Sequence, residues 1–112
     1  MSAPAFEIDS QLRDGEGRLR LMGEFDLAAA PRVEEAAERL IAEQPERLVV
    51  DLSALRFIDS SGLRVLVVLH QRASQEGWTL ELVRPEQPVL KVFQISGLEE
   101  RLHFVDSAST PL

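Results

Sequence analysis

The stretch Leu48–Leu69, LVVDLSALRFIDSSGLRVLVVL, organises the rest of the chain. Its first part, Leu48–Leu52, is a short apolar and partly β-branched run, which is typical of a buried strand. Residues 53–58 are interpreted as a connector. A second apolar run follows the segment DSSG at 59–62 and continues through polar residues to Glu76. Because that run is too long for a strand, it predicts a helix.

The serines of this segment, Ser60 and Ser61, are expected at the start of a largely buried helix. Backbone N–H groups at a helix start lack helical partners, and the helix dipole is positive there. The position therefore favours a phosphate or another anion. Serine and aspartate are also common helix caps in any protein, so a purely structural interpretation of Ser60 stays open at this point. Ser61 is interpreted mainly as structural, and Asp59 is itself a candidate N-cap.

The composition predicts one acidic globular domain spanning residues 1–112. With 19 acidic and 12 basic residues, the net charge is −7, which disfavours nonspecific binding to nucleic acid or to an anionic membrane. The absence of cysteine excludes disulfides and thiolate metal sites, and two histidines far apart in sequence argue against a histidine-based metal site. We expect no cofactor. No run approaches the roughly 18 apolar residues of a membrane span, and the N-terminus has no signal-peptide pattern, so the expected location is the cytoplasm.

The remaining segments predict alternating strands and helices after an N-terminal hairpin. Strands are expected near residues 5–9, 18–25, 48–52, 78–83 and 102–105, and helices over 31–44, 60–76 and 85–96. The order β-β-α-β-α-β-α-β requires parallel strands joined by right-handed crossovers. Strands laid side by side in chain order would carry their helices on one face. The sequence therefore predicts a singly wound α/β layer with a mostly parallel sheet, and it has no GxGxxG or GxxxxGK[ST] nucleotide motif.

Three motifs resemble the STAS family, and within it the anti-sigma factor antagonists of bacteria. The segment GEFD at 23–26 is similar to the family's G-E-[LF]-D at the end of the second strand. The segments VDLS at 50–53 and FIDSSGL at 57–63 are similar to its DLS…[FI]-D-S-S-G-L. The segment ISGL at 95–98, followed by Phe104, resembles its C-terminal S-G-L…F. The resemblance covers nearly the whole chain and implies the STAS fold.

The resemblance implies a regulatory binding protein that is not an enzyme. In that family the serine directly after the aspartate is phosphorylated by a partner anti-sigma factor, a serine kinase with a GHKL-type ATP site. The unphosphorylated antagonist binds the anti-sigma factor and frees the sigma factor, and a PP2C-type phosphatase removes the phosphate from the serine. Carried over to this sequence, the phosphoacceptor is Ser60. The expected partner-binding residues are Asp26, Asp59, Ser60, Ser61, Gly62, Leu63 and Arg64.

Three of these residues have open roles. Arg64 departs from the family, where many members have a small residue. It either projects into solvent or, four residues after Ser60, neutralises a phosphate on the same helix turn. Asp26 either orients the Ser60 hydroxyl, contacts the kinase, or is a solvated loop acid. Leu63 is interpreted as core in preference to a partner contact.

Three other functions are compatible with parts of the sequence. A phosphoaspartate receiver would use Asp51, but the only lysine, Lys91, is expected within a helix. A metal-dependent hydrolase built on Glu24, Asp26 and Asp59 would lack a nucleophile–base pair. The alternative that keeps the fold is a non-switching STAS subunit of a larger complex, such as a lipid-transport ATPase or a stressosome-like scaffold. The complete DSSG segment favours the phosphorylatable type.

Overall fold

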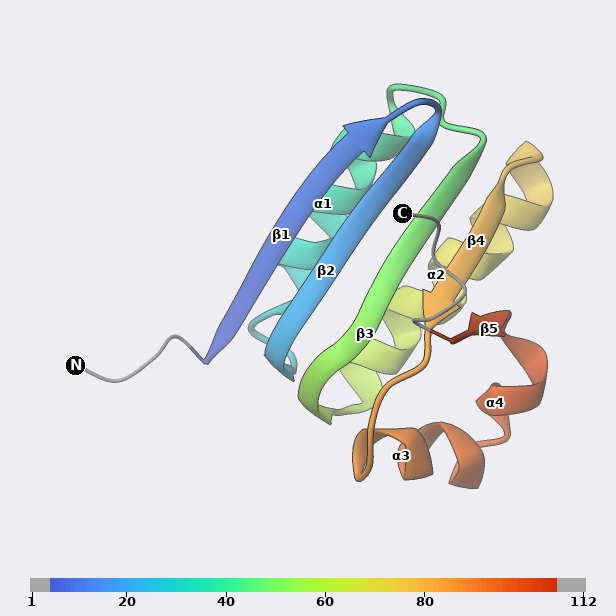
Figure 1. The fold of residues 1–112 in the computed structure, drawn as a ribbon. Coiled ribbons are helices and arrows are strands. Elements are labelled where there is room, and N and C mark those ends of the chain that lie inside the picture. Colours follow the sequence, from blue (N-terminus) through green and yellow to red (C-terminus); the bar gives the residue numbers. More distant parts are fainter. Residues whose placement is uncertain (1–4, 107–112) are drawn as a thin grey trace.

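The computed structural model describes residues 5–106, which form a five-stranded sheet and four helices (Figure 1). In chain order the elements are β1 (Phe6–Arg13), β2 (Glu16–Phe25), α1 (Ala30–Ile41), β3 (Arg47–Ile58), α2 (Ser60–Glu76), β4 (Thr79–Val83), α3 (Val89–Ile95), α4 (Leu98–Arg101) and β5 (Phe104–Val105). The strands lie in the order β1-β2-β3-β4-β5. The β1–β2 pair is antiparallel and the other three pairs are parallel. The predicted strand order is confirmed.

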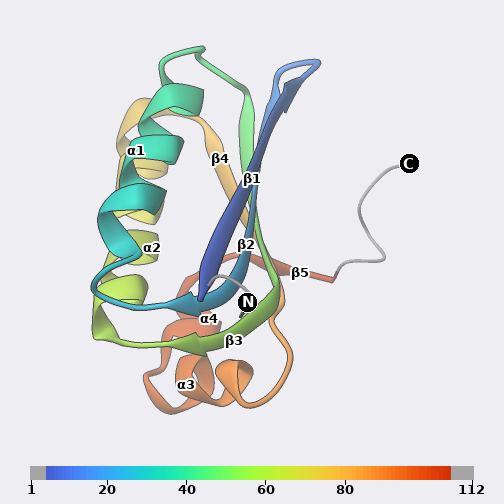
Figure 2. The ribbon, with the colours of Figure 1, turned by 90° about the vertical axis from the view of Figure 1, so that its left-hand side faces the viewer.

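The helices cover one face of the sheet. Figure 2 shows α1 and α2 side by side on that face, with α3 and α4 below them near the end where β3 finishes. No helix within residues 5–106 lies on the opposite face. This arrangement confirms the singly wound α/β layer, since every right-handed crossover between neighbouring parallel strands returns on the same side. No helix in this part of the chain is long and apolar enough to cross a bilayer.

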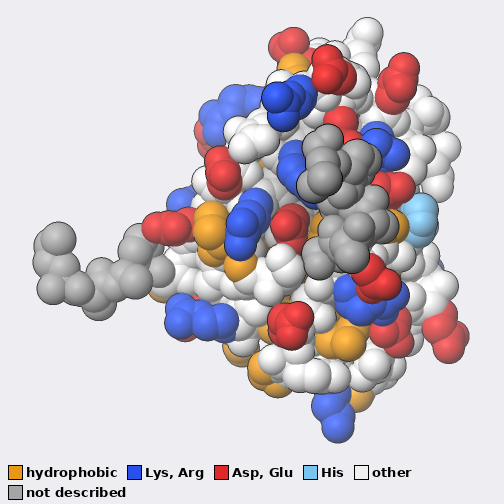
Figure 3. Space-filling model, in the orientation of Figure 1, with side chains coloured by type: hydrophobic (Ala, Val, Ile, Leu, Met, Phe, Trp, Pro, Cys, Tyr) orange, Lys and Arg blue, Asp and Glu red, His pale blue; other side chains and the backbone are white. Residues whose placement is uncertain are grey.

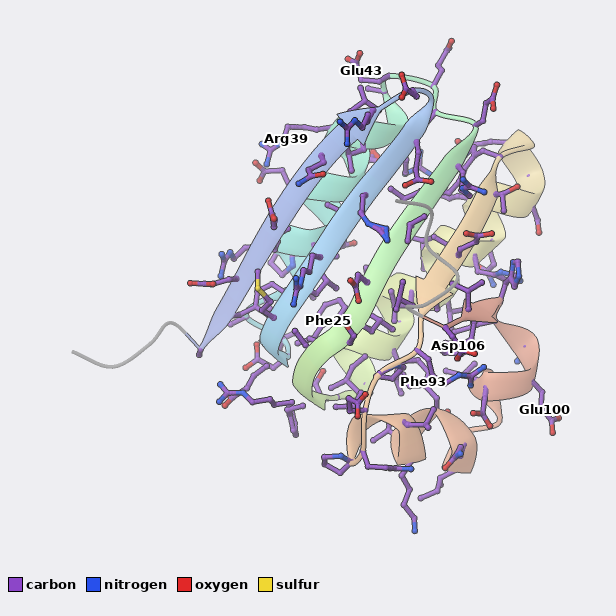
Figure 4. The ribbon with its side chains drawn as sticks, viewed as in Figure 1. Phe25, Arg39, Glu43, Phe93, Glu100 and Asp106 are labelled. Atoms are coloured by element: carbon purple, nitrogen blue, oxygen red, sulfur yellow. The ribbon has the colours of Figure 1, made fainter. Side chains whose placement is uncertain are left out.

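The hydrophobic core lies between the sheet and the two long helices. The buried face of α1 consists of Ala30, Val33, Ala36, Ala37 and Leu40, which recur at helical spacing. Phe25 from β2 and Phe93 from α3 are the largest fully buried side chains (Figure 4). α2 ends as predicted at Gly77, whose left-handed backbone (φ +83°) is accessible to glycine at little cost.

β3 continues to Ile58, so the interpretation of residues 53–58 as a connector is wrong. Its pairing with β2 shifts twice, and each shift places one extra residue in β3. As a result the buried side chains Leu52, Leu55 and Ile58 are spaced three apart. The Asp51 carboxylate accepts hydrogen bonds from the Ser53 N–H (2.9 Å) and hydroxyl (2.7 Å) at the first shift. These β-bulges remove the period-two pattern by which a strand is recognised.

The bulges also bend the sheet toward the functional site. A bulged strand curves and twists more strongly than a regular one. Figure 2 shows the lower ends of β2 and β3 curving toward the helix layer. At the end of this curve β3 finishes at Ile58, and α2 begins two residues later at Ser60.

Several element boundaries differ from those expected. β1 extends to Arg13, and the hairpin turn is only Asp14-Gly15, both at positive φ (51° and 80°), as a two-residue type I′ turn requires. α3 begins at Val89, after Pro88, and not near residue 85. The short helix α4 was not predicted, and it reduces the last strand to Phe104–Val105.

Candidate functional site

The candidate site lies where β2 and β3 leave the sheet. These strands are parallel, and their last paired residues are Phe25 and Ile58. The Asp59 N–H donates to the carbonyl oxygen of Phe25 at 3.3 Å. Asp26 directly follows Phe25, and Asp59 directly follows Ile58. Both aspartates therefore lie at the same end of the sheet, after neighbouring strands.

Asp59 is the N-cap of α2. Its backbone is extended, and its Oδ1 accepts hydrogen bonds from the N–H groups of Ser61 (2.9 Å) and Gly62 (3.1 Å). The expectation of free N–H groups as a phosphate seat is therefore wrong for these two residues, because a carboxylate already occupies that seat. An anion on Ser60 has to lie elsewhere or displace the Asp59 side chain.

Ser60 is the first helical residue of α2, and its side chain is exposed. Its hydroxyl makes no hydrogen bond to any other residue within 5–106. Ser61, directly after it, is half-buried, and its N–H is held by the cap. Of the two serines, Ser60 therefore presents the more accessible nucleophilic oxygen.

Gly62 allows the start of α2 to touch the ends of the two strands. It is buried, and a Cβ added there would lie 2.8 Å from the carbonyl oxygen of Phe25 and 2.8 Å from Cγ1 of Ile58. Such distances are too short for a carbon atom, so any larger residue has to push the helix away from the sheet. Leu63 is half-buried and packs against the core.

Asp26 and Arg64, the other charged residues of the predicted site, have different surroundings. The Asp26 Oδ1 accepts a hydrogen bond from the Ala29 N–H at 3.1 Å, so it stabilises the turn that leads into α1. Neither Asp26 nor Asp59 is hydrogen-bonded to the Ser60 hydroxyl. Arg64 is exposed and forms no ion pair with the residues that the structure describes.

Two exposed apolar side chains border the site and were not predicted from the sequence. Leu27, one residue after Asp26, is 73% exposed, and Phe57, two residues before Asp59, is 48% exposed. Figure 3 shows hydrophobic side chains gathered at the lower edge of the molecule, near the ends of β2 and β3. The exposure of Leu27 could have been predicted from the sequence, because a large apolar residue in a turn does not reach the core. For Phe57 the bulges of β3 hid which side it faces.

No group of three or more His, Cys, Asp or Glu side chains suited to a metal ion occurs within residues 5–106.

Comparison with known proteins identifies the family. The family model of the STAS domain matches residues 7–110. The crystal structure of an anti-sigma factor antagonist from Mycobacterium paratuberculosis has 28% sequence identity and a TM-score of 0.79, with coverage of 93% of this chain and 89% of that one. The antagonist SpoIIAA in its unphosphorylated form has 22% identity and a TM-score of 0.76, with coverage of 91% and 90%. No curated protein sequence matches the chain.

A third similar structure is that of SLC26A9, with 18% identity and a TM-score of 0.70. It covers 83% of this chain, but the match is only 18% of that much longer protein. The fold is therefore shared between small antagonists and a module of a larger protein. Because the family model spans almost the whole chain and the fold is that of the similar structures, the protein belongs to the STAS domain family.

Proposed function

We propose that the protein is an anti-sigma factor antagonist whose binding to its anti-sigma factor is switched off by phosphorylation of Ser60. The observation that carries the proposal is the exposed, unbonded hydroxyl of Ser60 at the first residue of α2. The similarity of nearly the full chain to the Mycobacterium paratuberculosis antagonist supports the general role. The expected partner is a cytoplasmic anti-sigma factor with GHKL-type serine kinase activity, and a PP2C-type phosphatase removes the phosphate. The chain itself is not expected to catalyse a reaction.

The electrostatics of the helix start explain how one phosphate can act as a switch. Phosphorylation adds about −1.5 to −2 charges at neutral pH. The Asp59 carboxylate holds the N–H groups of Ser61 and Gly62, so the phosphate gains little from the helix dipole and projects toward solvent. A docked partner would have to desolvate this phosphate beside the Asp59 carboxylate. A penalty of about 3 kcal/mol lowers the affinity roughly a hundredfold without any change of fold.

The surroundings of Ser60 suit a protein partner. Leu27 and Phe57 offer exposed apolar surface next in the chain to Asp26 and close to Asp59, and exposed apolar groups of this kind are often buried in a complex. Arg64 lies one helix turn after Ser60 and is exposed. In this proposal it contacts the partner in the unmodified protein and neutralises part of the phosphate charge after modification.

The test uses the full chain, the anti-sigma factor kinase from the same host and ATP. Phosphosite mapping by mass spectrometry should find phosphate on Ser60, and Ser60→Ala should abolish it. Ser61→Ala is the matched control, because it removes the neighbouring hydroxyl and should leave phosphorylation intact. In calorimetry Ser60→Ala should bind the kinase as wild type does, whereas Ser60→Asp should bind about a hundredfold more weakly. Equal affinities of wild type, Ser60→Ala and Ser60→Asp would refute the switch.

A second candidate function is a non-switching STAS subunit of a larger assembly. The match of this fold to a small part of SLC26A9 is the observation that favours it. Affinity purification from the native host separates the two functions. Recovery of a small GHKL-type ATPase supports the antagonist, whereas recovery of a lipid-transport ATPase supports the subunit.

A further inference from the structure

The outer edge of β1 is the feature that the proposed function leaves unused. β1 is the first strand of the sheet order, and no other described element lies beside its outer side (Figure 1). Edge strands expose a row of backbone N–H and C=O groups that can pair with another strand. Natural proteins commonly block such edges with short strands, proline, bulges or charged side chains, and of these β1 has only the charges of Glu7, Asp9 and Arg13. β1 is eight residues long and pairs with β2 in one uninterrupted register.

The pairing with β2 determines which backbone groups of β1 face outward. The Glu24 N–H donates to the carbonyl of Ala5 at 2.8 Å, and the register continues from Phe6↔Gly23 to Arg13↔Glu16. In an antiparallel pair, every second residue is hydrogen-bonded to the partner strand, so the odd-numbered residues of β1 bond to β2. The even-numbered residues therefore point their backbone groups outward. The Phe6 carbonyl fits this pattern, because it accepts from the Arg32 guanidinium at 3.3 Å.

We propose that this edge joins two copies of the chain, with their β1 strands antiparallel about a two-fold axis at Ser10. Ser10 then faces its own counterpart, and Ile8 faces Leu12 of the second copy. These positions are the ones with outward backbone groups, so they form the hydrogen-bonded pairs. Glu7 faces Arg13 in the closer, non-hydrogen-bonded positions. Two five-stranded sheets thus become one continuous sheet with an isologous interface.

The charges and the apolar side chains of β1 together select this register. The hydrogen-bonding parity allows only shifts by two residues. One shift places Asp9 opposite Asp9, and the next places Glu7 opposite Asp9, so both bring carboxylates together. A shift in the other direction places Asp9 opposite Arg13, which is favourable, but it sets Ile8 opposite Asp14 of the turn and Leu12 opposite Ser10, so both apolar residues face polar ones. Only the register centred on Ser10 pairs opposite charges while it also pairs the two apolar residues, and like charges directly opposite are destabilising.

The side chains along the edge fit the same pairing. Leu12 is 46% exposed although it is a large apolar residue in a strand. Ile8 is half-buried and lines a shallow hollow of about 310 Å³ together with Ser10, Arg32, Glu35, Ala36 and Arg39. Figure 4 shows Arg39 at this edge of the molecule. Because Ile8 and Leu12 lie on the same face of β1, the Leu12 of one copy would cover the Ile8 of the other beside this hollow.

Glu7 and Arg13 are charged residues of β1 that could pair across the proposed interface. Both are exposed, and neither forms an ion pair with another residue of the described range 5–106. In the proposed dimer each of them faces the opposite charge on the other copy, so the Glu7–Arg13 pair occurs twice, once on either side of the axis. Ser60 follows β3, two strands away from this edge, so the pairing leaves both phosphorylation sites accessible.

The test is sedimentation equilibrium of the full chain over a concentration series, which yields the dimer Kd. Wild type should dimerise with increasing concentration. Glu7→Arg and Arg13→Glu should each raise the Kd about tenfold or more, because each places like charges opposite one another. The double exchange Glu7→Arg with Arg13→Glu should restore the wild-type Kd. Glu34→Arg, an equal charge change on the exposed side of α1, is the control and should leave the Kd unchanged.

A backbone variant tests the strand pairing separately from the charges. Ser10→Pro removes an outward N–H but no hydrogen bond to β2, and proline is tolerated at such edge positions. It should abolish dimerisation while the circular dichroism spectrum stays native. A wild type that is monomeric at all concentrations would overturn the proposal, even if it pairs with a strand of another protein. A double exchange as weak as the single variants would also overturn it, and neither result bears on Ser60 phosphorylation.

Discussion

Replacement of Gly62 by alanine tests the closeness of α2 to the sheet, on which the position of Ser60 depends. The added Cβ would lie 2.8 Å from the Phe25 carbonyl oxygen, 2.8 Å from Cγ1 of Ile58 and 3.0 Å from Cγ of Phe25. The carbonyl oxygen of Phe25 belongs to the backbone, and the Cγ of Phe25 belongs to a fully buried ring, so neither of these two atoms can move away. The helix start has to move outward, which weakens the cap made by Asp59.

The expected loss follows from two opposing terms. Overpacking of a tight contact costs about 1–3 kcal/mol. Removal of a glycine from a helix returns about 0.5–1 kcal/mol. The two ranges leave a net loss between about 0 and 2.5 kcal/mol, and because the contacts at Gly62 include a backbone oxygen we expect about 1–2.5 kcal/mol, which is a decrease of several degrees in Tm for a chain of this size.

Urea unfolding measures this change, with the slope of the transition as a check that the unfolded state is unaltered. Ser74→Ala, at an exposed position of the same helix, is the control, and it should be neutral or slightly stabilising. The variant should also be phosphorylated more slowly, because the Ser60 hydroxyl moves with the helix start. A Gly62→Ala protein as stable as wild type would show that α2 does not need to approach the strands so closely.

Two further predictions concern the ends of α2. Asp59→Ala should cost about 0.5–2 kcal/mol in urea unfolding because it removes the cap, whereas Asp59→Asn keeps an acceptor oxygen and should lose less; equal losses would contradict the cap. The pKa of Glu76 is held below its usual range, first by the hydrogen bond from the Trp78 indole N–H (3.0 Å) and then by Arg72. A lowered pKa in the folded state means that this stabilisation is complete at neutral pH and is lost as the pH falls through the pKa of Glu76. Trp78→Phe should raise that pKa in an NMR titration, and an unchanged value would refute the assignment.

Local patterns in the sequence predicted most of the architecture. Side chains on one face of α1 repeat at helical spacing, and strands alternate with helices after the hairpin. These patterns report the backbone geometry of each segment, and with the strands laid side by side in chain order the crossover rule places the helices on one face. The segment DSSG also indicated the helix start and its exposed serine.

The predictions that failed depended on contacts between segments. The two bulges of β3 exist only in its pairing with β2, so its last residues carry no regular strand pattern of their own. Likewise, the N–H groups at the start of α2 are taken by Asp59 because its side chain turns back onto them, and Asp26 caps its own turn without reaching Ser60.

The pattern of single segments was enough to predict most of the strands and helices, their succession along the chain and the serine at a helix start, because each depends on residues that are neighbours along the chain. Three other features come only from the folded chain: the closeness of Gly62 to Phe25, the exposure of Leu27 and Phe57, and the outward face of the β1 edge. Each of these depends on which distant segment lies alongside, and the periodicity of a single segment does not encode that.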